Sequence, residues 1–142
     1  MRLLHRFHCA TDGLAALETA LVFPTVLIVL LLIMDTGVFF YDYVSASASV
    51  HEAARCGAVG HDDAAVTARV ENGGGFDDPG TVDVDRTAGR VGDEITVTAA
   101  YDHDWILPAS IFGVPSAYSV SSTMRIESVA VPPQPCAGGG GP

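Results

Sequence analysis

Two short stretches of the chain combine residue types that bind metals in other proteins. The first, HEAAR at 51–55, has the histidine and glutamate of a zinc-hydrolase helix, but Arg55 stands where the second histidine ligand is required. The second, DHD at 102–104, offers two carboxylates and an imidazole. Neighbouring residues of an extended chain point to opposite faces, which argues against a metal ion shared by all three. We therefore expect this stretch to lie in a solvated loop. The sequence therefore predicts no metal site and no cofactor.

A third chemical feature is the carboxylate of Glu18, which lies near the start of a strongly apolar segment. The segment, Leu14–Met34, has about 21 residues, and as a helix it would span roughly 31 Å, the thickness of a hydrocarbon core. Arg2 and Arg6 precede it and the next arginine is Arg55, so the distribution of positive charge predicts a cytoplasmic N-terminus. We therefore expect a single membrane span with the remainder of the chain outside.

Glu18 requires a partner in such a segment. An ionised carboxylate costs about 2.5–3.5 kcal/mol at the centre of a membrane helix, and less at a shallower depth. In an uncleaved chain the candidates are the helix N-terminus and Arg6. If the chain is cut between Gly13 and Leu14, the new α-amine lies four residues from Glu18 on the same helical face. Such a pair forms within one chain or between neighbouring chains, where it would fix their axial register.

The residues around this bond resemble a known family. A short basic leader ends in Gly13, and LAALE follows at 14–18. The stretch ETALVFP at 18–24 resembles the Glu-Phe-Ala-Leu-Val-x-Pro stretch of TadE/TadF-like minor pilins of tight-adherence (Flp-type) pilus systems. Thr19 stands where that family usually has an aromatic residue. The later stretches MDTGVFFYDYVSASASVHEAARCGA, ITVTAAY and STMRIES also resemble the family, up to about Ser128.

The resemblance implies a structural pilus component without enzymatic activity. It implies cleavage after Gly13 by a prepilin peptidase, insertion into the bacterial inner membrane, and contacts with other pilin subunits through the N-terminal helix. The mature chain would be a pilin-like subunit for pilus assembly and surface adhesion. Two alternatives stay open: an uncleaved single-pass protein with an extracytoplasmic binding domain, and a secreted soluble effector cut near Ala48.

The expected fold is α+β, with a long N-terminal helix that extends from the membrane into a small extracytoplasmic domain. The chain divides into a leader at 1–13, a membrane helix at 14–38, the domain at 39–131 and a disordered Pro/Gly-rich tail at 132–142. The formal net charge of −10 argues against nucleic acid as a partner, because phosphate binding requires a basic face.

Local patterns predict the elements of the domain. Pro24 lacks a backbone donor, which predicts a bend in the first helix, and the helical pattern continues to about Ala58. Asp62 is a favourable N-cap for a second helix, DAAVTARVE at 63–71. Beyond it the hydrophobic period changes to two, which predicts an antiparallel sheet of three to four strands covered by the first helix after about residue 45. The expected strands are 81–87, 94–101 and 117–131.

The cysteines depend on the processing step. Removal of the leader takes away Cys9 and leaves Cys56 and Cys136. In an oxidising compartment two remaining cysteines can pair, and the alternative is two free or intermolecular thiols.

The connection WILPASIFGVP at 105–115 is unusually apolar for a loop. It either folds over the small core or forms a docking patch for a pilus subunit or the outer leaflet. The residues concerned are Trp105, Ile106, Leu107, Ile111 and Phe112.

Overall fold

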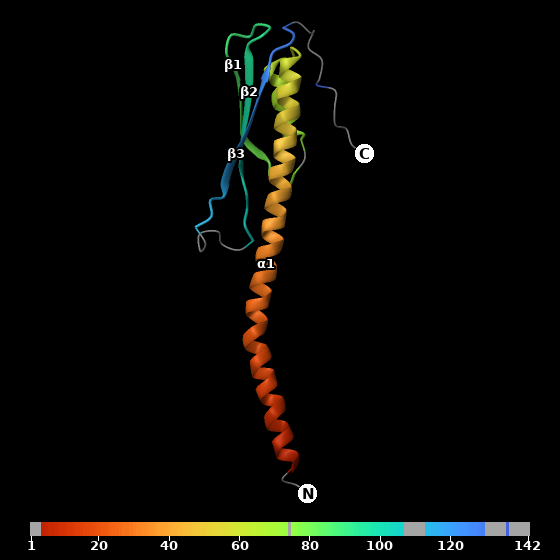
Figure 1. Ribbon diagram of the computed structural model, residues 1–142, viewed down its shortest axis with the longest axis vertical. Helices are drawn as coiled ribbons and strands as arrows, with labels where there is room; N and C mark the ends of the chain where they lie inside the picture. Colours follow the sequence, from red (N-terminus) through yellow and green to blue (C-terminus); the bar gives the residue numbers. More distant parts are fainter. Residues whose placement is uncertain (1–3, 74, 107–112, 130–135, 137–142) are drawn as a thin grey trace. The chain divides into compact units, whose positions relative to one another are not determined.

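The computed structural model describes residues 4–73, 75–106, 113–129 and 136, and for residues 4–12 it describes the backbone alone (Figure 1). Contacts between Cα atoms divide the chain into two compact units, Met1–Gly37 and Val38–Pro142. The first unit is helical in its described part. The second holds the end of the same helix, a shorter helix and a three-stranded sheet. This is the α+β fold that the sequence predicts.

Helix α1, Leu4–Ala58, is the longest element of the chain. It starts about ten residues before Leu14, so the segment predicted to be a leader is helical where it is described. A helix that has been nucleated extends through residues of adequate propensity, and no proline occurs between Leu4 and Gly13 to stop it.

The α1 backbone continues through Pro24. Because proline has no N–H group, the carbonyl of Ala20 lacks its usual helical donor. Thr19 and Thr36 satisfy their hydroxyl groups on the same helix by donating to carbonyl oxygens four residues earlier, at 2.9 and 2.7 Å. Bonds of this kind allow a hydroxyl group to stay in apolar surroundings.

Helix α2, Asp63–Glu71, has the bounds that the sequence predicts. The Asp62 side chain accepts a hydrogen bond from the backbone N–H of Ala65 at 3.0 Å and so caps the N-terminus. At the other end, the side-chain amide of Asn72 donates to the carbonyl of Ala68 at 2.6 Å. Both ends therefore satisfy backbone groups that a helix leaves without partners.

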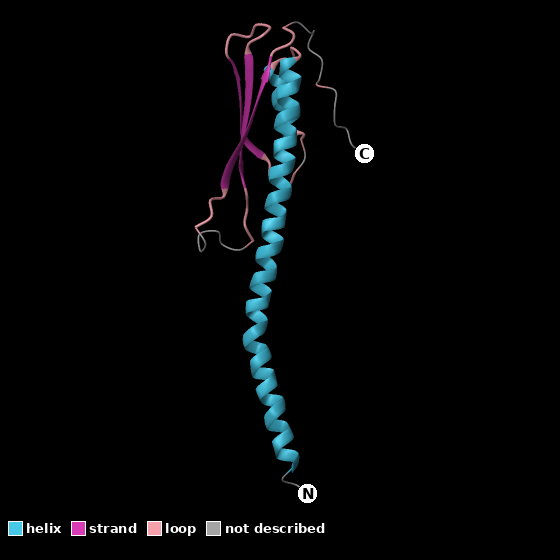
Figure 2. Cartoon of the chain, in the orientation of Figure 1, coloured by secondary structure: helices cyan, strands magenta, loops and turns pink. Residues whose placement is uncertain are grey.

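Three strands form one antiparallel sheet in the order β1-β2-β3 (Figure 2). Their bounds are Pro79–Arg86 for β1, Glu94–Asp102 for β2 and Ala117–Arg125 for β3. The predicted period of two is confirmed, because buried residues alternate with partly buried or exposed ones along β2. The register places Val84 opposite Val97, and Ala99 opposite Val120.

The third strand is shorter than the predicted 117–131, because the chain turns towards the end of α1. After Arg125, the backbone N–H groups of Glu127 and Ser128 donate to the carbonyl of Ala58 at 2.7 and 3.3 Å. That carbonyl lies at the C-terminus of α1, where helical partners are missing.

The core of the second unit lies between the sheet and α1, as predicted, and α2 contributes to it as well. Small side chains of α1 allow a close approach, and a Cβ at Gly57 would collide with the tip of Ile95. The buried residues include Ala46, Val50, Ala53 and Ala54 from α1, Val66 and Val70 from α2, and Ile95, Val97, Ala99 and Tyr101 from β2.

Arg86, at the end of β1, joins the two helices. Its guanidinium donates to Asp63 Oδ1 at 2.7 Å, to the carbonyl of His61 at 2.8 Å and to the carbonyl of Gly57 at 3.3 Å. A cation at the C-terminus of a helix is electrostatically favourable. The side chain therefore fixes the corner between α1 and α2.

Candidate functional site

The bond between Gly13 and Leu14, where processing is predicted, lies inside α1. Leu14 is 68% exposed, and a Cβ added at Gly13 would meet no atom within 4 Å. Glycine costs a helix about 1 kcal/mol relative to alanine, so this turn opens more easily than its neighbours. No described side chain crowds Gly13, and the backbone of the bond becomes accessible once the turn unwinds.

Glu18 lies one turn further along α1 and is exposed. None of the side chains that the structure describes forms an ion pair with it. Its carboxylate borders a shallow groove of about 460 Å³ along one face of the helix. The residues that line this groove are Ala15, Glu18, Thr19, Val22, Phe23 and Val26. The groove is therefore apolar along its length and negatively charged near its start.

The described apolar side chains of the first unit are largely exposed. Among the described residues, Gly13–Ala58 is the helical stretch long and apolar enough to cross a membrane, with a mean hydropathy of 2.5 in its most apolar window and none of that window buried. Leu17, Leu21 and Phe23 all expose more than half of their surface. Such a surface suits lipid or neighbouring membrane helices. The single apolar helix therefore suggests a membrane-anchored protein.

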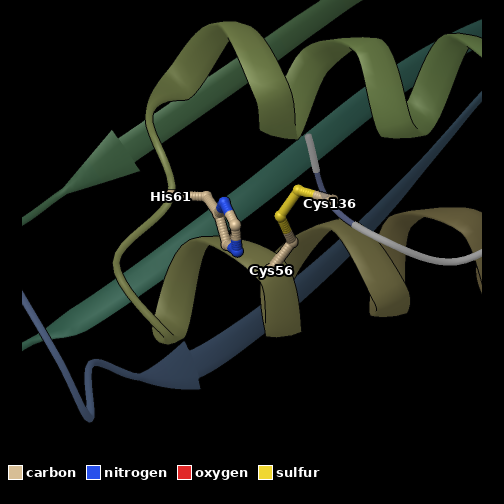
Figure 3. Close-up of side chains that lie close together, drawn as sticks. All are labelled: Cys56, His61 and Cys136. Carbon is tan, nitrogen blue, oxygen red and sulfur yellow. A yellow bond between two sulfur atoms is a disulfide. The ribbon is translucent and has the colours of Figure 1, made fainter. Parts of the chain in front are cut away.

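Cys56, near the end of α1, and Cys136 form a disulfide with their Cα atoms 5.9 Å apart (Figure 3). His61 lies beside them, and the three side chains bring possible ligand atoms within 4.8 Å of one another. In the disulfide neither sulfur is a thiolate, the form that binds metal ions. A pocket of about 430 Å³ beside the bond is lined by both cysteines and Arg69, so a small reductant has a route to it.

The HEAAR stretch of α1 contacts the rest of the second unit. Glu52 forms an ion pair with Arg69 of α2. His51 Nδ1 lies 3.4 Å from the hydroxyl oxygen of Ser122 in β3. These residues therefore connect α1 to α2 and to the sheet.

The predicted docking patch is described in part. The ring of Trp105 stacks on Phe39 of α1, with centroids 5.4 Å apart and an interplanar angle of 23°. Ile106 is 64% exposed. Trp105 therefore packs onto the domain, whereas Ile106 faces outward. Three further residues of the patch lie outside the described residues: Leu107, Ile111 and Phe112.

The prediction that DHD forms a solvated loop is wrong for its central residue. Asp102 and Asp104 are exposed, but His103 is only 3% exposed. Its Nδ1 lies 2.9 Å from Asp77 Oδ2 and 3.7 Å from Asp42 Oδ2. The alternation of faces was predicted correctly, but the buried side of β2 continues to His103. The burial of His103 could have been found from the alternation along β2, in which every second residue from Ile95 to Tyr101 is apolar.

Tyr118 of β3 borders the same buried cluster. Its hydroxyl donates to Asp77 Oδ2 at 3.4 Å. Burial, together with the negative charges of Asp77 and Asp42, raises the pKa of the Tyr118 hydroxyl. The group therefore stays protonated at neutral pH and acts as a donor.

Comparison with known proteins identifies the N-terminal region. Residues 13–55 match the family model described as TadE-like protein. The match begins at Gly13, contains Glu18 and Pro24, and ends in the last turn of α1. No match was found among curated proteins or among solved structures. The family and the apolar helix together suggest association with a membrane and with pilus subunits. The chain thus carries a TadE-like segment at residues 13–55, as the resemblance of its sequence predicts.

Proposed function

We propose that the chain is a pilin-like subunit, anchored in the bacterial inner membrane by α1, that takes part in the assembly of a tight-adherence pilus. The observation that carries the proposal is that the TadE-like match falls on the same residues as the uncovered apolar surface. The role is structural, with no enzymatic step. In this proposal residues 1–13 are removed, 14–38 form the anchor, and 39–131 contact other subunits.

The orientation follows from charge and redox chemistry. Arg2 and Arg6 favour a cytoplasmic N-terminus. The disulfide between Cys56 and Cys136 supports an oxidising environment for the second unit, because such bonds persist outside the cytoplasm. Both considerations favour an extracytoplasmic domain.

Glu18 sets the register of neighbouring subunits in this proposal. The occupant of its groove is the N-terminal helix of a neighbouring subunit, whose Leu14 amine pairs with the carboxylate. Charge complementarity favours this occupant, since Glu18 has no ion-pair partner among the described side chains. A carboxylate without a partner costs up to about 2.5–3.5 kcal/mol in a membrane helix, and the new amine removes that cost.

The processing step is tested by the mass and N-terminal sequence of the protein purified from its own membranes. We expect a chain that starts at Leu14. We expect Gly13→Val to leave the precursor uncut, because a branched side chain blocks close approach of a peptidase to the bond. Gly37→Val is the matched control: both glycines lie in α1, and a Cβ at either one meets no atom within 4 Å.

Two other N-termini would contradict processing at Gly13. A wild-type chain that starts at Met1 would be an uncleaved anchor with an extracytoplasmic binding domain. A chain that starts at Ser49 would be a secreted domain cut after Ala48, and the pilin-like role would be wrong.

The register charge is tested separately with Glu18→Gln, which keeps the side chain's size and removes its charge. We expect normal processing and membrane insertion. The amount of the variant in pili sheared from the cells should be at least about tenfold lower than for wild type, because one partner of a desolvated pair is gone. Glu71→Gln, which neutralises an exposed glutamate of α2, should leave that amount unchanged. Equal incorporation of Glu18→Gln and wild type would refute the register role.

A further inference from the structure

The second unit contains a cluster of three metal-ligating side chains that the proposed pilin role does not use. Asp42 comes from α1, Asp77 from the connection between α2 and β1, and His103 directly follows the last residue of β2. The possible ligand atoms of these residues all lie within 4.8 Å of one another. Three segments far apart in the sequence therefore present an imidazole and two carboxylates to one point.

The distances suit a tetrahedral metal ion. His103 Nδ1 is 2.9 Å from Asp77 Oδ2, with which it shares a hydrogen bond, and 3.7 Å from Asp42 Oδ2. Zinc binds nitrogen and oxygen ligands at about 2.0–2.2 Å, so the ligand atoms of a tetrahedral site are roughly 3.3–3.5 Å apart. The two observed distances lie on either side of that value. The third separation, between the two aspartate oxygens, is within 4.8 Å.

Burial leaves one carboxylate oxygen of the cluster without a donor. Asp42 is 2% exposed, and its Oδ2 has no hydrogen-bond partner among the described residues. Burying a carboxylate oxygen without a donor is costly. A metal ion between the three side chains would give this oxygen a partner. Arg69 and Arg86 form their ion pairs with Glu52 and Asp63. Among the described residues, no arginine forms an ion pair with Asp42 or Asp77.

Neighbouring groups already orient the carboxylates. The backbone N–H of Phe76 donates to Asp42 Oδ1 at 2.7 Å, which directs Oδ2 towards His103. Gly75 makes this turn possible, because its φ of 131° is a conformation that other residues rarely adopt. Tyr118 donates to Asp77 Oδ2. Hydrogen bonds of this kind around metal ligands fix their orientation and strengthen binding.

The surroundings combine an apolar wall with a route for entry. The His103 ring meets Trp105 edge to face at 4.8 Å and Phe39 at 5.4 Å between centroids. Asp77 also lines a cavity of about 40 Å³, together with Gly75 and Tyr101, which is room for a water molecule or an ion. The Asp77 side chain is 11% exposed, so a solvated ion can reach it.

We propose that Asp42 Oδ2, Asp77 Oδ2 and His103 Nδ1 bind one divalent transition-metal ion, zinc above all. The imidazole favours zinc over calcium and magnesium, which prefer oxygen ligands alone. Three protein ligands leave a fourth position for water. The ion joins α1, the β1 connection and β2 at one point. This inference does not depend on the pilin-like role, since it concerns the folded domain alone.

The test is zinc binding to the full-length protein in detergent, stripped with EDTA, without a polyhistidine tag and with its disulfide intact. Trp105 is the single tryptophan of the chain and lies beside His103, so its fluorescence reports on this site. We expect one zinc ion per chain by calorimetry, a matching change in Trp105 fluorescence, and quenching by cobalt at the same stoichiometry. Calcium at equal concentration should produce neither effect.

Variants separate this site from other places where zinc could bind. Asp77→Asn and His103→Gln should each weaken binding at least about tenfold. Asp102→Asn and Asp104→Asn remove the same type of charge from the exposed neighbours of His103 and should leave binding unchanged. His61→Gln should also have no effect, because His61 belongs to the cysteine cluster.

Three results would overturn the proposal. The first is a wild-type protein, folded by near-ultraviolet circular dichroism, that binds no zinc at millimolar concentration. The second is zinc affinity that survives both Asp77→Asn and His103→Gln. The third is affinity that is lost in His61→Gln. The wild-type titration of Trp105 fluorescence decides the matter even if a variant fails to fold.

Discussion

Loss of the disulfide between Cys56 and Cys136 should destabilise the second unit by about 2–4.5 kcal/mol. The bond connects residues 80 positions apart, and the loop that it closes contains α2 and all three strands. In the chain-entropy description, closing a loop of about 80 residues costs the unfolded state about 4.5 kcal/mol at 25 °C. That figure applies if the reduced protein keeps its folded arrangement unchanged.

The folded protein recovers part of this freedom when the bond is reduced. The last described backbone hydrogen bonds before Cys136 run from Glu127 and Ser128 to the carbonyl of Ala58, about eight residues earlier. Reduction of the folded state therefore opens a loop of only about eight residues. Loop entropy grows as the logarithm of loop length, so the loss of stability depends on the ratio of the two loops, about 80 to about 8 residues. The expected loss is therefore about 1.5RT ln 10, or about 2 kcal/mol.

The assay is urea unfolding of the full-length protein in detergent, followed by the fluorescence of Trp105, with and without dithiothreitol. With a slope of about 1–2 kcal/mol per molar urea, a loss of 2 kcal/mol lowers the midpoint by about 1–2 M. The double variant Cys56→Ala/Cys136→Ala should show the same midpoint without reductant. Cys9→Ala, outside the loop, should not change it. A shift below about 0.5 kcal/mol in the double variant would refute the reasoning.

Three further changes can be followed in the same assay. Arg86→Gln removes donors to the carbonyls of His61 and Gly57 and should cost about 1–3 kcal/mol, whereas Arg90→Gln, at an exposed position, should change stability by less than about 0.5 kcal/mol. Ile95→Ala truncates a fully buried side chain and should cost about 2–5 kcal/mol; a cost below about 1 kcal/mol would mean that this core is not packed as described. The folded state raises the pKa of Tyr118 above its ordinary value of 10.0, so it keeps a proton that the unfolded chain releases. The free energy of unfolding should therefore fall as pH rises above about 10, and it should fall less steeply for the Tyr118→Phe variant. Equal slopes of stability against pH for the two proteins would contradict this account.

The parts of the fold that the sequence predicts are those with local causes. Helix α2 begins after Asp62 because that carboxylate reaches the N–H of Ala65, and both residues are close in the sequence. The strands follow from a period of two, which depends only on each strand having one buried face. The start of α1 was predicted less well: Gly13 marks a bond of chemical interest, but a single glycine does not end a helix.

The buried cluster around His103 shows how far periodicity can be extended. Counting by two from Ile95 places His103 on the buried face of β2, and counting by four back from Ala46 places Asp42 on the buried face of α1. Two polar residues were therefore predictable as buried, and buried polar groups require partners. The position of Asp77 was not predictable, because it lies in a connection with no period of its own. An isolated buried imidazole or carboxylate would be a cost to the fold, so a predicted pair of them is itself a reason to look for a third ligand or an ion between them.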